Sequence, residues 1–563
     1  MELKRFNDNF TVSGQLRAED LPALREAGVK YLICNRPDQE AADQPSYAEL
    51  SQAAADLGMQ MHHLPVVHDF INSAQVRAFD ELLQGMDGPV HAFCRSGLRS
   101  ATLWSLAQVQ HGANVDEVVQ AATANGFDFK TFPTRFKGVM DELGDAFASL
   151  PVQAHCPVLI VGAGSAGISV AASMLKRDRM VRITIVDPAA THYYQPGFTM
   201  VGGGVFSLES TKRPMHSLIP QGVSWIRAGV THFLPDQNQV VLDDGTKLSY
   251  ERLVVCPGLK LNWSGIEGLE ETLGKNGVTS NYLPELSAYT WELVSSFKGG
   301  KAVFTQPPMP IKCAGAPQKA LYLSADHWLR QNMLDKVQID FYNAGPVLFG
   351  VKDYVPALQS YIDKYQAKVH YGHNLVKVDG NAKLATFVTT GSDGQPQRIE
   401  VPFDILHVVP PQCAPDFIRQ SPLADLGGWL DLDPATLRHR RYANIWGLGD
   451  VGNTPNAKTA AAVRKQAPIV ANNLLADMHG GGTLYEYLGY GACPLTVERG
   501  KIVLAEFGYG GKLQPSLPLW LLEGTKPTWQ AWFLKASVLP WMYWNLMLKG
   551  HELLAAPEQE YKG

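Results

Sequence analysis

The chain has 563 residues, of which 45% are apolar and 18% charged, and its formal net charge is −5 at pH 7. This length predicts about three or four globular domains with large apolar cores. Lysine and arginine are scattered along the chain rather than clustered, which argues against a nucleic-acid partner.

The seven cysteines include no C-x-x-C pair, a pattern that fits neither a disulfide framework nor a zinc site. We therefore expect a reducing compartment and no metal. The first residues lack the apolar core of a signal peptide, and no uncharged apolar run reaches about 18 residues. These features predict a cytoplasmic protein without a membrane-spanning helix.

The first 148 residues have the pattern of a small α/β domain. Strand-like and helical stretches alternate, the strands at 31–35, 63–67 and 90–93 and the helices at 18–27, 47–57 and 74–84. Such alternation predicts a parallel sheet covered by helices.

A cysteine loop follows the third of these strands. Cys94 begins the segment Cys-Arg-Ser-Gly-Leu-Arg99, which leads into the apolar helical stretch 101–110. A helix N-terminus and a neighbouring arginine both stabilise a thiolate, so we expect Cys94 to be a nucleophile rather than a structural cysteine. The loop N–H groups and Arg99 would hold an oxyanion or a persulfide. Four residues separate Cys94 from Arg99, one fewer than in protein tyrosine phosphatases, which favours a small ligand, as in single-domain rhodanese-type sulfurtransferases.

The N-terminal segment, over about residues 3–140, resembles the phosphatase-like domain of β-lactamase-hydrolase-like proteins, notably in the stretches 12–15, 34–40 and 63–67. The resemblance implies a dual-specificity-phosphatase-like or rhodanese-like fold with Cys94 as nucleophile and Arg99 as anion clamp. Asp69 is the candidate general acid, and Asp38 is the alternative.

A glycine-rich turn after residue 161 predicts a dinucleotide site. It follows the apolar strand 158–161, and Asp187 closes the next strand, 25 residues after the first glycine. The glycines allow the backbone to approach a pyrophosphate at a helix N-terminus, and the acid accepts ribose hydroxyls. The alternative is an ordinary strand–turn–helix. The residues expected to bind the cofactor here are Gly162, Gly164, Ser165, Ala166, Gly167 and Asp187.

A second turn, Gly449-Asp450, matches the other half of a split FAD site. Its acid could hold the ribityl or pyrophosphate end from the opposite side. We therefore predict FAD as cofactor and a two-lobed flavoprotein over residues 156–480, with a second α/β lobe at about 295–400. Where flavin disulfide reductases carry an NAD(P)H fingerprint, this chain has a segment that ends in Cys313. This difference suggests that electrons reach the flavin through sulfur, and an NAD(P)H-dependent quinone reductase is the alternative.

Residues 156–552 resemble the mitochondrial type of sulfide:quinone oxidoreductases. The stretches that carry the resemblance are 192–196, 201–204, 310–319, 406–411, 458–462, 492–495 and 541–544. It implies a Rossmann-type flavin disulfide reductase-like fold, FAD held in part by Lys458, quinone as electron acceptor, and sulfide or a low-molecular-weight persulfide as substrate.

In that family two cysteines act together, and Cys313 matches the one that serves the flavin. The resemblance places the second directly after the Gly-Asp turn, where this chain has Val451. Cys413 follows a strand that should end near the isoalloxazine, so it could replace the missing partner or be an incidental loop cysteine. Cys493 is expected to pack in the core.

The tail, residues 481–563, is apolar and rich in tryptophan. Five tryptophans lie among lysines and apolar residues: Trp520, Trp529, Trp532, Trp541 and Trp544. This mixture is typical of helices that lie in a lipid headgroup layer, which predicts attachment to the inner face of the membrane. The same residues could instead fill a helical pair or the interface of a homo-oligomer.

Together these patterns predict an FAD-dependent sulfide or persulfide oxidoreductase that reduces quinone. Sulfane sulfur would pass to a thiol acceptor, with Cys94 as one candidate. The alternative is a phosphatase domain joined to a flavoprotein that no longer oxidises sulfide, and Val451 favours that alternative.

Overall fold

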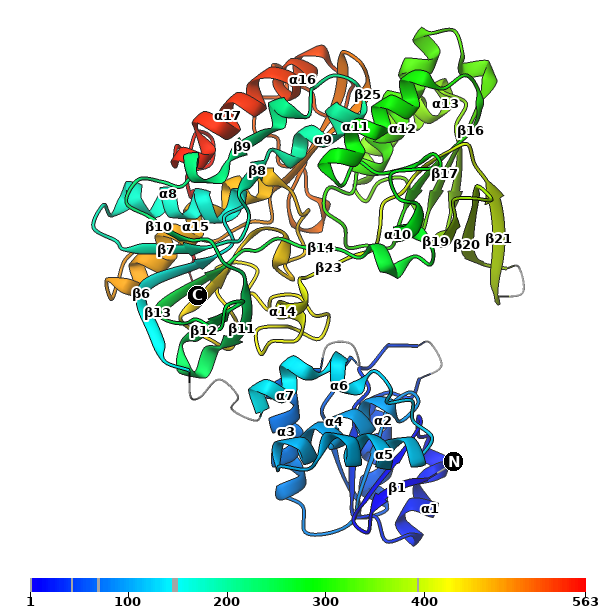
Figure 1. Cartoon of the computed structure of the whole chain (residues 1–563), viewed down its shortest axis with the longest axis vertical. Coiled ribbons are helices and arrows are strands. Elements are labelled where there is room, and N and C mark those ends of the chain that lie inside the picture. Colours follow the sequence, from blue (N-terminus) through cyan, green and yellow to red (C-terminus); the bar gives the residue numbers. More distant parts are fainter. Residues whose placement is uncertain (1–2, 42–43, 68–70, 144–149, 392–393, 563) are drawn as a thin grey trace. The chain divides into compact units, whose positions relative to one another are not determined.

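The computed structural model describes residues 3–41, 44–67, 71–143, 150–391 and 394–562 (Figure 1). They form two compact units. Unit 1 contains residues 1–155, 229–250 and 416–431, and unit 2 contains residues 156–228, 251–415 and 432–563. Asp69 lies outside the described residues. Both units mix helices and strands, which confirms the predicted α/β class. The domain boundaries expected near residues 148 and 480 stay predictions.

Unit 1 is built on a five-stranded sheet of order β1-β2-β5-β3-β4. Only β1 and β2 are antiparallel, and β5 pairs in parallel with both β2 and β3. The strands are β1 (Lys4–Asn7), β2 (Phe10–Ser13), β3 (Tyr31–Cys34), β4 (Gln60–His63) and β5 (Val90–Phe93). The strand expected at 63–67 therefore lies earlier in the chain. Pro65, which has no N–H to donate, follows within two residues of its end.

Helices cover this sheet and bury its apolar side chains in two clusters, one around Phe79 and Trp104 and one around Leu21 and Leu50. The helices are α1 (Leu21–Glu26), α2 (Tyr47–Asp56), α3 (Ser73–Gln84), α4 (Leu98–Gln110), α5 (Val115–Ala124), α6 (Phe132–Arg135) and α7 (Lys137–Leu143). Unit 1 also contains the meander of β11 (Val230–Leu234), β12 (Gln239–Leu242) and the start of β13 (Lys247–Val255), and helix α14 (Asp416–Arg419).

The first sheet of unit 2 places the turns that follow Val161, Val255 and Gly447 at one edge, and each of these turns contains glycine. Its parallel pairs join β10 (Ser224–Ile226) to β7 (Ile183–Val186), β7 to β6 (Val152–Val161), and the end of β13 to β24 (Ile445–Gly447). Helices α8 (Ser165–Arg177) and α15 (Ala460–Met478) share its core. Carboxyl ends of parallel strands are where such sheets bind ligands.

The second sheet of unit 2 is wholly parallel, in the order β15-β22-β16-β17-β18. Its strands are β15 (Val278–Thr279), β16 (Gly300–Gln306), β17 (Val337–Asn343), β18 (Lys368–Tyr371) and β22 (Ile405–His407), and its helices are α11 (Pro284–Ser296), α12 (Ala316–Arg330) and α13 (Val355–Lys364). A three-stranded antiparallel sheet, β19 (Asn374–Asp379), β20 (Leu384–Thr390) and β21 (Pro396–Pro402), lies beside it in Figure 1. The Cys313 segment connects β16 to α12.

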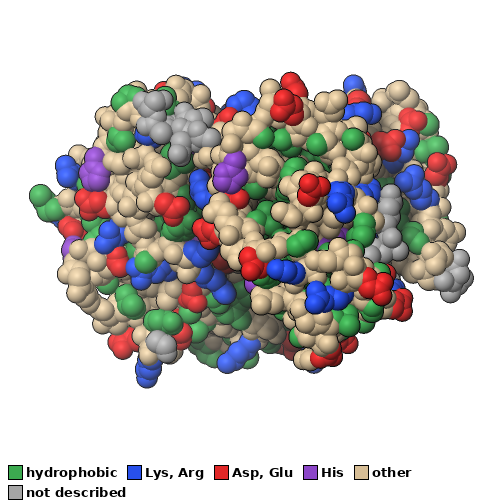
Figure 2. Space-filling model, turned by 90° about the horizontal axis from the view of Figure 1, so that it is seen from below, with side chains coloured by type: hydrophobic (Ala, Val, Ile, Leu, Met, Phe, Trp, Pro, Cys, Tyr) green, Lys and Arg blue, Asp and Glu red, His purple; other side chains and the backbone are tan. Residues whose placement is uncertain are grey.

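The tail begins with a hairpin of β25 (Gly491–Glu498) and β26 (Lys501–Phe507), which packs into the core around α12. It continues into α16 (Trp529–Phe533), a π-helical turn (Leu534–Val538) and α17 (Leu539–Asn545). Among the described residues, no helix combines the length and apolarity that crossing a membrane requires. On the face shown in Figure 2, basic and acidic side chains lie interspersed.

Candidate active sites

The turn after β6 needs its glycines for two physical reasons. Gly162 has a φ of +108°, and a Cβ there would lie 2.5 Å from the carbonyl oxygen of Cys256. A Cβ on Gly167 would lie 1.9 Å from the carbonyl oxygen of Gly162. At Gly164 a Cβ would meet nothing within 4 Å, so the backbone faces open space. An open backbone at a helix N-terminus is what a pyrophosphate requires.

Asp187 and the Gly449 turn lie around the same open space. Asp187 accepts hydrogen bonds from the backbone N–H groups of Ala163 (2.6 Å) and Ala189 (2.8 Å). Gly449 has a φ of +80°, and burial raises the pKa of the Asp450 carboxyl beside it. The buried Lys458 donates from Nζ to the carbonyl oxygens of Asp450 (2.9 Å) and Gly452 (2.5 Å), so it holds this turn in shape.

One cavity of about 650 Å³ joins these residues. Its lining includes Gly162, Gly164, Ser165, Ala166, Asp187, Gly449, Asp450 and Lys458. A cradle open at Gly164, a carboxylate at the next strand end and a second acid opposite fit FAD. Cys313 and the C-terminal helices also line this cavity.

Cys313 contacts a second thiol. Its Sγ lies 3.4 Å from Sγ of Cys493, which is 180 residues away in the sequence. Cys313 itself has a φ of +52°, and its N–H donates to the carbonyl oxygen of Lys458 at 2.9 Å. A Cβ on Gly315 would lie 2.6 Å from Sγ of Cys493, so only glycine lets β25 approach this turn. A positive φ at a residue other than glycine, as at Cys313, is often found at functional sites.

A buried lysine accompanies the two thiols. Nζ of Lys319 donates to Sγ of Cys313 at 3.0 Å. The pKa of Cys313 lies well below its ordinary value. The hydrogen bond with the Cys493 thiol and the charge of the Lys319 ammonium lower it, and together they outweigh the effect of burial. The pKa of Cys493 is raised instead, chiefly by its hydrogen bond with Cys313. Cys313 is therefore the thiolate of the pair. A second buried lysine, Lys535, lines the same cavity, donates to the carbonyl oxygen of Pro196 at 2.7 Å, and has its pKa lowered to about 7 by burial and by Lys319.

The structure places Val451 and Cys413 differently from Cys493, and the catalytic role of Cys413 stays a prediction. Val451 follows the Gly-Asp turn and is fully buried. Cys413 lies in the short strand β23 (Gln412–Cys413), where it pairs with Lys260 of β14 (Lys260–Leu261), and it is not among the described residues that line the cavity. Cys493 is buried in the core, as expected, but its thiol also contacts Cys313. The expectation of a packing role alone was incomplete.

The C-terminal helices have two different faces. Leu534, Val538, Leu539 and Met542 line the cavity. The exposed fractions of Trp529, Phe533 and Trp541 are 66%, 55% and 56%, and that of Trp520, just before these helices, is 85%. The helices therefore wall the cavity on one side and present aromatic side chains on the other.

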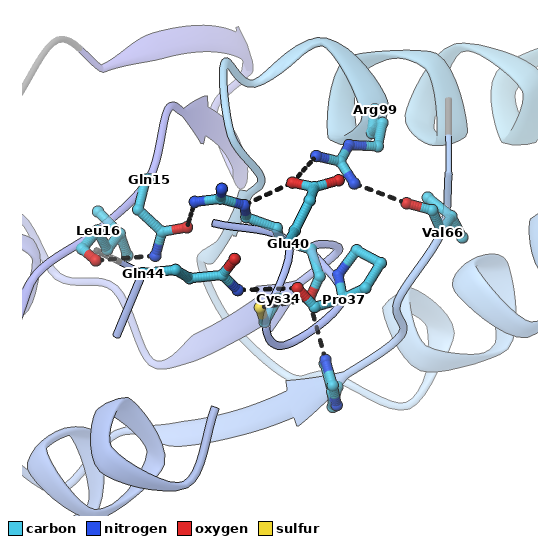
Figure 3. A network of polar contacts seen from close by, with 10 residues as sticks. Gln15, Leu16, Cys34, Pro37, Glu40, Gln44, Val66 and Arg99 are labelled. Atoms are coloured by element: carbon cyan, nitrogen blue, oxygen red, sulfur yellow. Dashed lines mark hydrogen bonds and ion pairs between the residues drawn. The ribbon is translucent and has the colours of Figure 1, made fainter. Parts of the chain in front are cut away.

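In unit 1, the Cys94 loop joins a strand to a helix, as the sequence predicts. Cys94 follows β5, Gly97 has a φ of +84°, and α4 begins at Leu98. Arg99 is buried and donates to the carbonyl oxygen of Val66 (2.9 Å) and to the carboxylate of Glu40 (2.8 Å), as Figure 3 shows. Asp38, the alternative general acid, accepts a hydrogen bond from the backbone N–H of Tyr47 at 2.8 Å. The roles of Cys94, Arg99 and Asp69 stay predictions.

Three residues at these sites were missed by the sequence analysis: Cys493, Lys319 and Glu40. Lys319 lies in the first turn of α12, six residues after Cys313, so a helix starting close to the cysteine could have indicated it. Cys493 lies in the stretch 492–495 that carries the family resemblance, but its contact with Cys313 could not be predicted, because the packing of a distant hairpin sets it. Glu40 lies in a stretch whose charged residues look like an exposed turn.

Comparison with known proteins supports both units. Residues 2–112 match the phosphatase-like domain of the β-lactamase hydrolase-like protein, and residues 156–288 match the pyridine nucleotide-disulphide oxidoreductases. The mitochondrial sulfide:quinone oxidoreductase of Dictyostelium discoideum is 41% identical over 396 residues, which cover 70% of this chain and 86% of that protein. The chain belongs to the sulfide:quinone oxidoreductase family. Membership confirms the predicted FAD cofactor, which the cavity fits.

Two further similarities concern the fold and the N-terminal region. The X-ray structure of the sulfide:quinone oxidoreductase from Aquifex aeolicus has a TM-score of 0.60 at 18% identity, covering 73% of this chain and 97% of that one, so the fold is shared. The β-lactamase hydrolase-like protein of Agrobacterium fabrum is 33% identical over 129 residues, 23% of this chain and 30% of that protein. This sulfide:quinone oxidoreductase family member therefore carries an additional N-terminal domain.

Proposed function

We propose that the protein oxidises sulfide, or a low-molecular-weight persulfide, at the Cys313–Cys493 pair and delivers the electrons to quinone. The observation that carries the proposal is the 3.4 Å separation of the two sulfur atoms beside a cavity that fits FAD. Lys319, 3.0 Å from Cys313, supports it because a cation stabilises the thiolate that such chemistry needs.

The chemistry begins with the two cysteines joined as a disulfide. Hydrosulfide attacks the sulfur of Cys493, so that Cys493 carries a persulfide and Cys313 leaves as a thiolate beside Lys319. A thiol acceptor then removes the outer sulfur as its own persulfide, and Cys493 is left as a thiol. When the disulfide forms again, two electrons and the thiol proton are released. Bound FAD would accept these electrons and pass them on to quinone.

The C-terminal tail supports the use of quinone and attachment to a membrane. The apolar side chains of the C-terminal helices line the cavity, and Trp520, Trp529 and Trp541 are exposed. Helices with exposed tryptophans lie at lipid surfaces, where a lipid-soluble quinone is dissolved. We place the protein on the cytoplasmic, inner face of the membrane, attached through these helices.

Reduction of a short-chain quinone by purified protein tests the proposal. We expect turnover that depends on sulfide, is accelerated by a thiol acceptor such as glutathione, and yields a persulfide. NADH should not replace sulfide. Quinone reduction with NADH and none with sulfide would instead indicate the NAD(P)H-dependent alternative.

For the N-terminal domain we propose sulfur transfer through Cys94. The short loop between Cys94 and Arg99 and the helix N-terminus at Leu98 support a small bound group. Phosphatase activity is a second candidate, because residues 2–112 match a phosphatase-like domain.

The two candidates can be separated in a full-length Cys313→Ser/Cys493→Ser variant, which removes the other thiol pair. Incubation with glutathione persulfide should leave one extra sulfur on the Cys94 peptide by mass spectrometry. Hydrolysis of an aryl phosphate without any sulfur on Cys94 would favour the phosphatase.

A further inference from the structure

The guanidinium of Arg99 is already bound to an anion of the protein itself. Figure 3 shows the carboxylate of Glu40 beside Arg99, and the same carboxylate also binds a second arginine, Arg36. One carboxylate oxygen of Glu40 accepts from Nη2 of Arg99 at 2.8 Å and from Nε of Arg36 at 2.6 Å. Each arginine also makes a hydrogen bond inside the protein: Arg99 donates to the carbonyl oxygen of Val66 at 2.9 Å, and Arg36 donates to the side-chain oxygen of Gln15 at 2.8 Å.

Both arginines of this cluster are buried, and the glutamate is partly exposed. Arg36 and Arg99 are 4% and 6% exposed, whereas the Glu40 side chain is 28% exposed. Burial works to raise the pKa of Glu40, but the hydrogen bonds from Arg99 and Arg36 outweigh it and lower that pKa. Glu40 is therefore ionised and is the solvent-facing member of the cluster.

An anion bound by Arg99 would lie close to this carboxylate, which is itself hydrogen-bonded to the guanidinium. A phosphate ester carries two negative charges near neutral pH, and its oxygens would lie within a few ångströms of Glu40 if Arg99 bound them. Repulsion at that range in a partly buried site changes binding by about tenfold or more. The sulfur of a persulfide such as glutathione persulfide brings at most one negative charge to the same place.

We propose that Glu40 determines the specificity of the Cys94 loop by acting as a built-in anion on Arg99. It excludes dianions such as phosphate esters and leaves the loop to persulfides, whose reacting sulfur carries at most one negative charge. The inference rests on the proposed sulfur transfer at Cys94, since it explains how a phosphatase-like loop is restricted to that chemistry.

Binding of tungstate, a stable dianion of phosphate-like shape, tests the inference by calorimetry on the full-length protein. Glu40→Gln keeps the size and the acceptor oxygen but removes the charge, so it should bind tungstate at least about tenfold more tightly than the wild type. It should also hydrolyse aryl phosphate faster, and Arg99→Met in the same background should lose the gain. Glu81→Gln, at an exposed position of α3, is the matched control and should bind like the wild type.

A second variant separates charge from structure. Glu40→Asp keeps the charge and should bind tungstate as weakly as the wild type. Equal affinity in the wild type and Glu40→Gln, or an equal gain in Glu40→Asp, would overturn the inference. Sulfur loading of Cys94 is measured on the same proteins. If no sulfur is loaded while Glu40→Gln still gains tungstate, the proposed sulfur transfer fails and the role of Glu40 stands.

Discussion

The two cysteine sites of this chain have similar local structure but different surroundings. Cys94 and Cys313 both lie in turns between a strand and a helix. Cys313 lines a cavity and has a second sulfur at 3.4 Å and a lysine at 3.0 Å. Cys94 is 1% exposed and lies near an arginine whose charge is taken up by Glu40.

This difference fits the two proposed roles. A two-electron step needs a second sulfur close by, and among the described residues Cys313 has one. The proposed transfer step needs a single nucleophile and a cradle that selects the donor, and the Cys94 loop fits that proposal.

The largest effect is expected from Cys313→Ser. Without the thiolate that lines the flavin cavity, reduction of bound FAD by sulfide should slow on the order of 10³-fold or more, while the yellow FAD is retained. Stopped-flow absorbance of the flavin under anaerobic conditions measures this directly. Unchanged kinetics would remove Cys313 from the mechanism.

Removal of the lysine should have the next largest effect. In Lys319→Met the pKa of Cys313 should rise, because the variant loses a cation that favours the thiolate. The pH at which Cys313 of the reduced protein becomes reactive should therefore move upward by about one unit or more. The pH dependence of iodoacetamide labelling, read on the Cys313 peptide, gives this midpoint. A midpoint equal to that of the wild type would show that Lys319 has no such role.

A smaller, severalfold effect is expected at the membrane. The triple variant W520S/W529S/W541S removes exposed aromatic rings and should float with liposomes several times less efficiently than the wild type. Met180→Ser changes another exposed apolar residue, which is 86% exposed, and is the control. Unchanged flotation together with a loss of self-association would favour the homo-oligomer interface instead.

The smallest effect on the oxidoreductase is expected from Cys94→Ser. Because the flavin cavity lies wholly in unit 2, the rate of flavin reduction by sulfide should stay within about twofold of the wild-type rate, a difference well under 1 kcal/mol. The variant should nevertheless lose the sulfur carried by unit 1. A large fall in flavin reduction would mean that the two sites do not work independently.

Much of the fold and of the candidate sites could be predicted from local sequence patterns. The Cys94 loop and both FAD turns are contiguous motifs, so the strand, the glycines and the following helix could be predicted together. In contrast, the Cys313–Cys493 contact spans 180 residues and depends on how the β25–β26 hairpin packs against α12. The cluster of Glu40, Arg36 and Arg99 was missed for the same reason, because tertiary packing buries charges that look exposed in the sequence.

We propose that Cys493, and not Cys413, completes the redox pair with Cys313. Anaerobic titration of the bound flavin with sulfide in Cys493→Ser and Cys413→Ser tests it most directly. We predict that sulfide no longer bleaches the flavin of Cys493→Ser and that Cys413→Ser is bleached like the wild type. Normal bleaching of Cys493→Ser, or its loss in Cys413→Ser, would contradict the account.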